Sequence, residues 1–402
     1  MDMQANQQGT CIEQARDEVE LSIVMPCLNE VETLANCIQQ AQETLRDHHI
    51  DGEIVVADNG STDGSIQIAT DLGARLVHVA RKGYGNALMG GIAAARGKYV
   101  LMGDSDASYD FRETPRFLEH LRRGNDLVMG CRMPSGGGEV RPGAMPFLHR
   151  WLGNPVFTLL VRWWFHAPIH DVHCGLRAFT RELFDRLDLR CSGMEFASEM
   201  VIKASLHRAN IGEVPITLHP DGRRSRPAHL RTFRDGWRHL RFYLMCCPRW
   251  LYLGPGGFLI VFGLLCYLLG LPGVRLRGVG FAEHTLLFGT LAILCGYQAL
   301  LFALFTKTFA VSEGILPSDE RVDKLLDRMN LDRSLLLGVI LLLAGIGLLI
   351  YTITYWRSLH FGELNYRFTM RLVVPGAMLT ALGFQTILGA FFVAILRMPH
   401  KV

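Results

Sequence analysis

The chain has 402 residues, of which 49% are hydrophobic and 20% are charged, and its formal net charge is only +3. So small a net charge gives no argument for a nucleic-acid partner, and we expect none. The length predicts two or three domains, and apolar residues concentrate in the last third of the chain. The 10 cysteines include no Cys-x-x-Cys pair and no zinc-ligand spacing, which favours reduced thiols in a cytosolic domain.

Residues 1–19 are polar and acidic and lack the pattern of a secretory signal, so we expect a mobile lead-in there. Short apolar runs then alternate with helical patterns. The predicted elements are a strand at 21–25 that Pro26 ends, a helix at 32–46, a strand at 53–57, a helix from about 65, a strand at 74–80, a helix at 86–96 and a strand at 99–102. This order predicts an α/β fold with a mainly parallel, doubly wound sheet.

Polar segments follow three of these strands, and in such sheets ligands bind outside the carboxyl ends of the strands. The segments are residues 26–30 (PCLNE), 58–63 (DNGSTD) and 104–106 (DSD). Within them, Asp58 can accept a hydrogen bond from a nucleotide base, or it can be an ordinary turn residue. The chain has neither a G-x-x-x-x-G-K-[ST] loop nor a complete dinucleotide fingerprint, so phosphates must be held by a metal and by cationic side chains.

Asp104 and Asp106 lie two residues apart after a predicted strand, so we expect their side chains to share a face. Two neighbouring carboxylates are unfavourable unless a positive charge lies between them. Mg²⁺ commonly takes one or two carboxylates together with substrate phosphates. The pattern therefore indicates a divalent cation that holds a nucleoside diphosphate, and the alternative is a solvated turn.

Four segments carry a resemblance to a known family, namely IVMPCLNE from Ile23, VVADNGSTDG from Val55, DSD from Asp104 and HDVHCGLR from His170. They resemble glycosyltransferase family 2, and within it the polyprenyl-phosphate glycosyltransferases of the dolichyl-phosphate mannose synthase type. The resemblance covers residues 20–245. It implies a GT-A fold, which is a Rossmann-like nucleotide-sugar domain.

The resemblance implies that Asp104 and Asp106 serve the donor diphosphate and a metal, Mg²⁺ or Mn²⁺. It further implies a nucleoside pocket, lined by Pro26, Asn29, Glu30 and Asp58. In the related enzymes a short polar ligand often follows the Asp-x-Asp motif. Here Ala107 and Ser108 follow it, and the next acidic residue is Asp110, so a third metal ligand is not assigned.

The resemblance also implies residues for the acceptor and for the transfer. Arg132 and Arg150 are expected to hold the phosphate of the acceptor, because a guanidinium group can donate two hydrogen bonds to phosphate. For Arg150, the alternative is an exposed arginine at the end of a helix. The expected catalytic group consists of Asp171, Asp106 and Arg177.

Asp171 stands where the family carries an acidic residue that is sometimes described as the base. A phosphate monoester has a second pKa of about 6, so it is largely dianionic at neutral pH and has no proton to remove. We therefore favour an orienting role for Asp171, toward Arg177 or the acceptor, over an obligate base. Arg177 can equally form a structural ion pair with Asp171.

Glu195 and Glu199 lie one turn apart on a predicted helix and share a face. The resemblance implies that this segment lies under the sugar, whereas the helix dipole also favours acidic residues in a first turn. An edge strand is predicted at 213–219, and the next loop carries Arg223 and Arg224. We interpret this loop as a cationic flap that closes on the donor diphosphate, with attraction to lipid headgroups as the alternative.

Residues 229–250 are basic and amphipathic, which is typical of a helix at a membrane interface. Four apolar runs follow, each longer than the roughly 20 residues that span a bilayer, at 251–274, 285–306, 334–355 and 372–396. The distribution of basic residues between the runs predicts a cytoplasmic catalytic domain in a multi-pass membrane protein. The expected organisation is a lead-in (1–19), a GT-A domain (20–228), a juxtamembrane helix (229–250) and an all-α transmembrane domain of four helices (251–402).

These expectations combine into one function. The chain is expected to transfer a single sugar from a GDP- or UDP-linked donor to polyprenyl phosphate at the cytoplasmic membrane face. The reaction would depend on a metal, and inversion at the sugar follows from the resemblance alone. The alternatives are a membrane glycosyltransferase for another lipid or polysaccharide acceptor, and a non-catalytic membrane scaffold. The sequence does not decide whether the chain forms a homo-oligomer.

Overall fold

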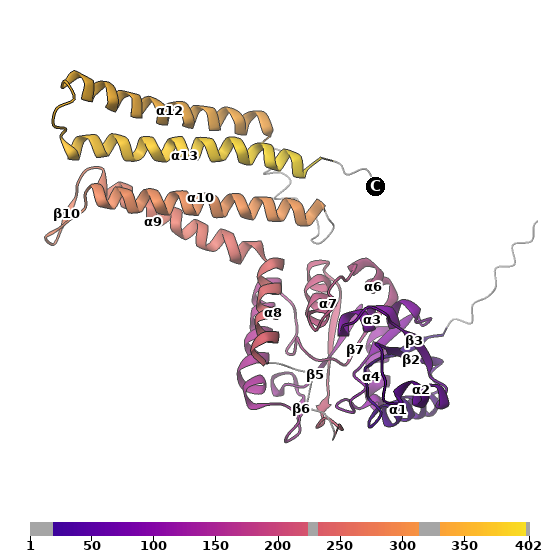
Figure 1. Ribbon diagram of the computed structural model, residues 1–402. Coiled ribbons are helices and arrows are strands. Elements are labelled where there is room, and N and C mark those ends of the chain that lie inside the picture. The colour runs from indigo at the N-terminus through magenta and orange to yellow at the C-terminus, as the bar shows by residue number, and fades with distance from the viewer. Residues whose placement is uncertain (1–18, 224–231, 313–329, 399–402) are drawn as a thin grey trace, which may run out of the picture. The chain divides into compact units, whose positions relative to one another are not determined.

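The computed structural model describes residues 19–223, 232–312 and 330–398 (Figure 1). The chain divides into two compact units, Met1–Leu240 and Arg241–Val402. The division falls within helix α8 (Thr232–Cys246). We describe each unit by itself.

The first unit is built on a seven-stranded sheet with the strand order β3-β2-β1-β4-β7-β5-β8. Its strands are β1 (Leu21–Cys27), β2 (Gly52–Asp58), β3 (Arg75–His78), β4 (Tyr99–Met102), β5 (Leu127–Cys131), β7 (Arg177–Thr180) and β8 (Ile211–Pro215). All neighbours pair in parallel except β7, which runs antiparallel to β4 and to β5. The predicted α/β fold with a mainly parallel sheet is confirmed.

Helices connect the strands as the alternating pattern predicted. They are α1 (Leu34–Asp47), α2 (Ser65–Asp71), α3 (Tyr84–Ala94), α4 (Thr114–Arg122), α5 (Asn154–Phe165), α6 (Arg181–Leu187) and α7 (Glu195–Leu206). Shorter elements are η1 (Phe111–Glu113), η2 (Pro134–Gly136), η3 (His149–Gly153) and the paired strands β6 (Glu139–Val140) and β9 (Thr217–Leu218). In α1 the apolar positions at helical spacing, Leu34, Ile38 and Ala41, are fully buried, so this face of the helix belongs to the core.

Most boundaries differ from the prediction by one or two residues, and two of the differences have a consequence for the site. Pro26 does not end the first strand, because β1 pairs with β2 as far as Cys27 but with β4 only as far as Val24. Proline has no N–H group, and here it lies where the pairing with β4 has already ended, so no hydrogen bond of that ladder is lost. Helix α3 begins at Tyr84 and not at 86, which makes Tyr84 part of its first turn.

In its described residues, the second unit contains four long apolar helices. They form the candidate spans Arg249–Gly270, Glu283–Ser312, Leu331–Ser358 and Tyr366–Leu396, of 22, 30, 28 and 31 residues. The first span joins η4 (Arg249–Leu253) to α9 (Gly254–Gly270), and the others are α10, α12 and α13. A short hairpin of β10 (Arg275–Leu276) and β11 (Val279–Gly280) separates α9 from α10. Each span exceeds the roughly 20 residues that cross a bilayer, which confirms the four predicted spans.

Helices α12 and α13 pack at glycines, and this packing gives a first prediction. A Cβ atom on Gly345 would lie 2.4 Å from the backbone N of Thr380 and 2.6 Å from the carbonyl O of Gly376. Gly345→Ala should therefore lower the free energy of unfolding by about 1–3 kcal/mol, because the helices must separate. Thermal unfolding of the full chain in one detergent would measure this.

The matched control lies one half-turn away on the same helix. A Cβ atom on Gly347 would have no atom within 4 Å. Gly347→Ala should leave the melting temperature unchanged or raise it, since alanine favours a helix over glycine by about 1 kcal/mol. Equal melting temperatures for the two variants would contradict close packing at Gly345.

Candidate active site

The loops that follow β1, β2 and β4 meet at the carboxyl edge of the sheet. The loop after β1 is held by the loop after β2, because the amide of Asn29 donates to Ser61 Oγ at 2.9 Å and that of Glu30 donates to Ser65 Oγ at 2.8 Å. The loop after β4 joins them, since Thr33 Oγ1 donates to the carbonyl of Ser105 at 2.7 Å. The three polar segments that the sequence singled out therefore form one site.

The antiparallel strand β7 brings a fourth motif to the same edge. Arg177, the first residue of β7, pairs with Met102 at the end of β4 and with Met129 near the end of β5. The amino end of an antiparallel strand lies beside the carboxyl ends of its parallel neighbours. The segment that begins at His170 thus lies next to the Asp-x-Asp loop, and Gly175 N donates to Tyr109 Oη at 2.8 Å.

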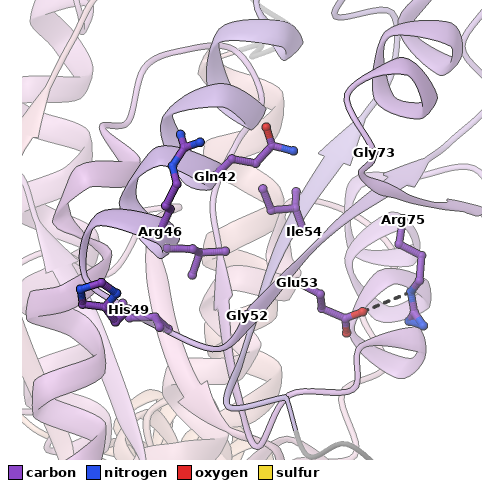
Figure 2. A pocket seen from close by; sticks show the side chains of 10 residues that line it. Gln42, Arg46, His49, Gly52, Glu53, Ile54, Gly73 and Arg75 are labelled. Atoms are coloured by element: carbon purple, nitrogen blue, oxygen red, sulfur yellow. Dashed lines mark ion pairs between the residues drawn. The ribbon is translucent and has the colours of Figure 1, made fainter.

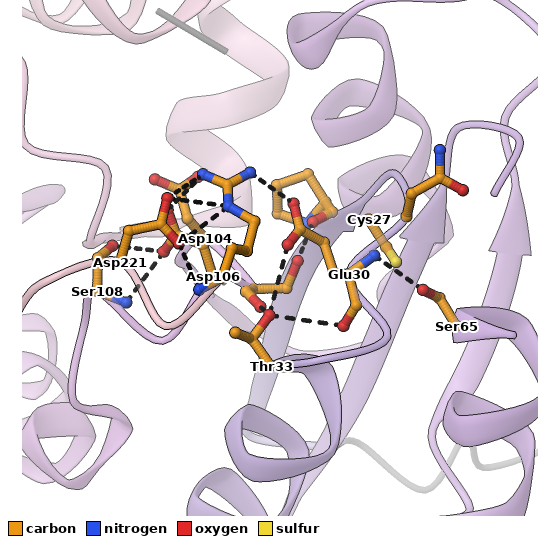
Figure 3. Close-up of polar contacts among 12 residues, drawn as sticks. Cys27, Glu30, Thr33, Ser65, Asp104, Asp106, Ser108 and Asp221 are labelled. Carbon is orange, nitrogen blue, oxygen red and sulfur yellow. Dashed lines mark hydrogen bonds and ion pairs between the residues drawn. The ribbon is translucent and has the colours of Figure 1, made fainter. Parts of the chain in front are cut away.

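Arg223 lies among carboxylates at this edge. Figure 3 labels these acidic residues, which are Glu30, Asp106 and Asp221. Arg223 Nη1 is 3.0 Å from Glu30 Oε1, and its Nη2 is 3.5 Å from Asp106 Oδ2. Asp221, two residues before it, accepts from its Nε at 2.9 Å. One guanidinium group thus neutralises acidic side chains from three segments, and it brings the predicted cationic loop into contact with Asp106.

The pKa values of two carboxyl groups are raised here. Burial raises the pKa of Glu30 to about 7; the Arg223 charge opposes this effect, and the nearby Asp106 and Asp221 add to it. Burial and then repulsion from Asp106 raise the pKa of Asp104 to about 6, although Tyr84 Oη donates a hydrogen bond to Asp104 Oδ1 at 2.8 Å. A cation bound beside these two carboxyl groups would favour their ionised forms.

The donor set around Asp104 and Asp106 fits a hard divalent cation. Both residues offer carboxylate oxygens, and Asp106 Oδ1 is held in place by the amide of Ser108 at 3.0 Å. Within the described residues, no three or more His, Cys, Asp and Glu side chains come together as a metal site, so protein ligands alone would not fill the coordination shell here. Asp110 has a structural role, because its Oδ1 caps η1 by accepting a hydrogen bond from Arg112 N at 3.0 Å. Two carboxylates would leave the other positions to phosphate and water, as Mg²⁺ prefers.

Two residues of the expected nucleoside pocket, Asp58 and Pro26, form hydrogen bonds that hold the loops at this edge. Asp58 accepts from the amides of Gly60 and Ser61, both at 3.0 Å, so its carboxylate shapes the turn. Burial alone would raise the pKa of Asp58, but the hydrogen bonds, from Ser61 above all, lower it below the ordinary value. The carbonyl of Pro26 accepts from Ser105 Oγ at 2.7 Å. Nucleoside binding by these residues stays a prediction.

Asp171 forms a buried ion pair with Arg132 and not with Arg177. Arg132 Nε and Nη2 lie 2.7 and 2.8 Å from the two carboxylate oxygens, and the Arg132 amide donates at 3.1 Å. The side chain of Asp171 is 0% exposed and that of Arg132 is 8% exposed. The interpretation that pairs Asp171 with Arg177 is therefore wrong.

Arg177 is buried against backbone carbonyls instead. Its guanidinium group donates to Ala197 O at 2.6 Å and to Cys174 O at 3.2 Å, and burial lowers its pKa. Carbonyl oxygens from α7 and from the loop before β7 thus satisfy the charge without a carboxylate partner. These contacts favour a structural role over the predicted catalytic one.

The remaining predicted residues are spread around this edge. Glu195, in the first turn of α7, forms an ion pair with Arg238 of α8 at 2.6 Å. Glu199 pairs with Lys203 at 3.0 Å and accepts from the amide of Cys191 at 2.7 Å, which is a structural role. Arg150 lies in η3, 5.4 Å from the ring centroid of Trp151. Residue 224, the second flap arginine, lies outside the described residues.

Sequence reasoning missed two residues of the site. Tyr84 fixes one oxygen of Asp104, and its signal was an aromatic residue between two glycines, at 83–85, immediately before a helix. Asp221 holds Arg223, and its signal was an acidic residue within an otherwise basic loop. Neither signal is specific without the three-dimensional contact.

A cavity of about 560 Å³ lies at the opposite edge of the sheet (Figure 2). Its lining includes Gly52 and Arg75, which are the first residues of β2 and β3, and Arg46 near the end of α1. Glu53 and Arg75 pair across it at 3.4 Å. Because it lies at the amino ends of the strands, this cavity is separate from the site described above.

Comparison with known proteins agrees with this geometry. A model of the glycosyl transferase family 2 matches residues 22–188, and a model of the glycosyltransferase family 2 C-terminal transmembrane region matches residues 304–397. The low-salt glycan biosynthesis hexosyltransferase Agl6 of Haloferax volcanii is 38% identical over 380 residues, which are 94% of this chain and 89% of that protein. A dolichyl-phosphate hexose transferase of the same organism is 31% identical over 198 residues, which are 49% of this chain and 82% of that protein.

The chain also has a distant match among solved structures. Glucosyl-3-phosphoglycerate synthase from Mycobacterium tuberculosis, in complex with Mn²⁺, UDP and glucosyl-3-phosphoglycerate, is 24% identical. The match covers 57% of this chain and 80% of that one, with a TM-score of 0.45. The family models and the match to Agl6, which extends over 94% of this chain, are sufficient for the assignment. The chain belongs to glycosyltransferase family 2, as a membrane glycosyltransferase with a GT-A-like domain and a C-terminal transmembrane region.

Proposed function

We propose that this glycosyltransferase moves one hexose from a GDP- or UDP-linked donor to polyprenyl phosphate, with inversion at the sugar. The observation that carries the proposal is the cluster of Asp104, Asp106 and Arg223 at the carboxyl edge of the sheet, in a chain with four candidate spans. A lipid acceptor requires an enzyme that works at a membrane. The dolichyl-phosphate hexose transferase among the relatives supports the same class of acceptor.

The donor would bind across the loops after β1, β2 and β4. We assign Mg²⁺ or Mn²⁺ to Asp104 and Asp106, where the ion would supply positive charge to the leaving diphosphate. Arg223 would add cationic charge to the site of the leaving diphosphate, and we expect the same of Arg224, the next residue in the sequence. The nucleoside would contact a set of residues in the first two loops, namely Pro26, Asn29, Glu30 and Asp58. Glu195 would face the sugar.

The acceptor phosphate would be held by Arg132 and Arg150. A phosphate oxygen of the acceptor would form the new bond to the anomeric carbon while the bond to the donor diphosphate breaks, and the nucleoside diphosphate would leave with the bonding electrons. A phosphate dianion needs no base for this step. Asp171 would act as a positioning residue, because both of its oxygens contact Arg132.

The catalytic domain would face the cytoplasm. Residues 307–333, from the end of the second span to the start of the third, carry Lys307, Arg321, Lys324, Arg328 and Arg333, whereas the two other connections carry fewer basic residues. Cytoplasmic loops of membrane proteins are enriched in lysine and arginine. An even number of spans would return both termini to that side.

The raised pKa of Asp104 gives a prediction for metal binding. Below about pH 6, the pKa of this carboxyl, protons occupy the site and an incoming Mn²⁺ ion must displace one. The apparent affinity for Mn²⁺ should therefore fall as the pH drops through 6, approaching about tenfold for each pH unit. Electron paramagnetic resonance of free Mn²⁺ in titrations of the full chain between about pH 5 and 7.5 would measure it. An affinity that is constant over this range would contradict the assignment.

A panel of donors tests the proposed reaction. The purified full chain would be mixed with polyprenyl phosphate, Mg²⁺ or Mn²⁺, and GDP-mannose, UDP-glucose, UDP-galactose or UDP-N-acetylglucosamine in turn, with lipids read by mass spectrometry. We expect a monoglycosyl-phosphate lipid from one donor. Donor hydrolysis or binding without such a product would reject this acceptor. Absence of both binding and product for every donor would favour a scaffold.

A further inference from the structure

Two candidate spans of the second unit each carry a charged residue near their start. Glu283 is the first residue of α10, and Arg371 lies in the second turn of α13. Glu283 is only 6% exposed, so the protein itself buries this carboxylate. Among the described residues, Glu283 Oε1 and Arg371 Nε have no hydrogen-bond partner, and no ion pair joins the two side chains. Ionisable residues within membrane spans are rare and mark functional sites.

Helices α10 and α13 lie side by side and run in the same direction (Figure 1). Tyr297 Oη and Thr386 Oγ1 are 2.7 Å apart. Further along both helices, Phe305 packs against Phe392 with ring centroids 4.8 Å apart. Because later residues of α10 contact later residues of α13, the two helices are parallel neighbours.

This packing puts Glu283 and Arg371 at the same level of the two helices. Leu286 and Val374 belong to one buried apolar cluster. Each of them lies three residues after one of the charged residues, and residues three apart share a helix face. The guanidinium group of Arg371 lies over the connection between α9 and α10, because a Cβ atom on Gly273 would be 2.7 Å from its Nη2. A carboxylate and a guanidinium group thus lie beside the same apolar cluster.

The two side chains have complementary requirements. A guanidinium group can donate two hydrogen bonds to a phosphate. A carboxylate accepts readily from an ammonium group, which carries three donors. In an ethanolamine phospholipid, a short linker joins a phosphate to an ammonium group, so one headgroup can satisfy both side chains. A choline headgroup has no N–H donor for Glu283 Oε1, and an anionic headgroup would bring a second negative charge to this carboxylate.

We propose that Glu283 and Arg371 bind the headgroup of a phospholipid that carries a phosphate and a primary ammonium group, such as phosphatidylethanolamine. Leu287 and Phe368, each about one helical turn from one of the charged residues, are 49% and 42% exposed. They offer an apolar surface to the acyl chains of that lipid. The site lies in the second unit and depends on neither the sugar nor the acceptor assigned above.

Native mass spectrometry of the delipidated full chain tests this preference. The protein in detergent is titrated in turn with phosphatidylethanolamine, phosphatidylcholine and phosphatidylglycerol of the same acyl chains, and binding of the first lipid is quantified. We expect phosphatidylethanolamine to bind about tenfold more tightly than either other lipid, since it alone satisfies both side chains. Equal affinities, as expected if water alone bridges the two residues, would overturn the proposal, and so would a preference for phosphatidylglycerol.

Two variants locate the preference. Glu283→Gln should remove the advantage of phosphatidylethanolamine over phosphatidylcholine, whereas Arg371→Gln should weaken the binding of all three lipids, because all three carry a phosphate. If one variant does not fold, as judged by its melting temperature without lipid, the other decides.

Glu363→Gln and Arg367→Gln are the matched controls, since both residues are exposed near the same end of α13. Both controls should keep the preference for phosphatidylethanolamine. A preference that survives Glu283→Gln, or that the controls lose as well, would reject the site. The readout is lipid binding, so it is independent of whether the donor panel finds a product.

Discussion

Replacing Asp106 by asparagine is expected to lower kcat/KM for sugar transfer by about 10²- to 10³-fold, equivalent to about 3–4 kcal/mol of transition-state stabilisation. Asp106 faces Arg223 and lies close enough to Asp104 to raise the pKa of that residue. Removing its charge weakens the attraction for a divalent cation where the leaving diphosphate becomes negative. Steady-state kinetics with the donor found in the panel would measure the loss.

The fold should survive this change. Ser108 N donates to Asp106 Oδ1 at 3.0 Å, and an asparagine oxygen can accept the same bond. The melting temperature should therefore stay close to that of the unmodified chain. Mn²⁺ affinity should fall together with activity, which distinguishes a lost ligand from a general loss of protein.

Asp110 provides a matched control four residues away. Its carboxylate caps η1 by accepting from Arg112 N, a task that asparagine also performs well at the start of a helix. Asp110→Asn should keep kcat/KM within about twofold of the unmodified chain, since its carboxylate caps η1 and pairs with the exposed side chain of Arg112 at 3.8 Å. Comparable losses in the two variants would show that the effect of Asp106→Asn comes from net charge and not from its position.

The sequence was informative where local pattern decides the structure. Short apolar runs between helical patterns predicted the strands, and the polar segments after them predicted the loops that meet at one edge. Glu30 and Asp104 could be assigned to the same edge of the sheet because they follow β1 and β4, which are neighbouring parallel strands. Leu34 and Ile38 could likewise be assigned to the core, because helical spacing fixes the face on which they lie.

Contacts between distant segments could not be predicted in this way. For Asp171 the sequence suggested Arg177, six residues later, or the acceptor as partner, whereas Asp171 pairs with Arg132, 39 residues earlier. That partnership depends on β7 running antiparallel between β4 and β5, which no local pattern encodes. The contact of Arg223 with Glu30, 193 residues apart, depends on the same long-range assembly.

Variants that remove one charge of the buried pair are the second change with a large expected effect. Asp171→Asn and Arg132→Gln should each lower kcat/KM for the lipid acceptor by about 10²-fold or more, because each leaves a buried charge without its partner. The loss should appear mainly as a raised KM for the lipid, since the pair would hold the acceptor phosphate. Breaking a buried ion pair also costs about 3–5 kcal/mol of stability, so lower melting temperatures should accompany both changes.

The double variant decides between positioning and base catalysis. If Asp171 acts only through Arg132, the double variant should lose no more activity than the worse single variant, and the two changes should be strongly non-additive. An obligate base would behave differently: Asp171→Asn would lose far more kcat than Arg132→Gln, and the two losses would add. The carboxylate of Asp171 is fully buried and both its oxygens contact Arg132 at 2.7 and 2.8 Å, so a proton transfer to it would first have to break this pair. We therefore expect the non-additive result, with the pH dependence of kcat unchanged in Asp171→Asn.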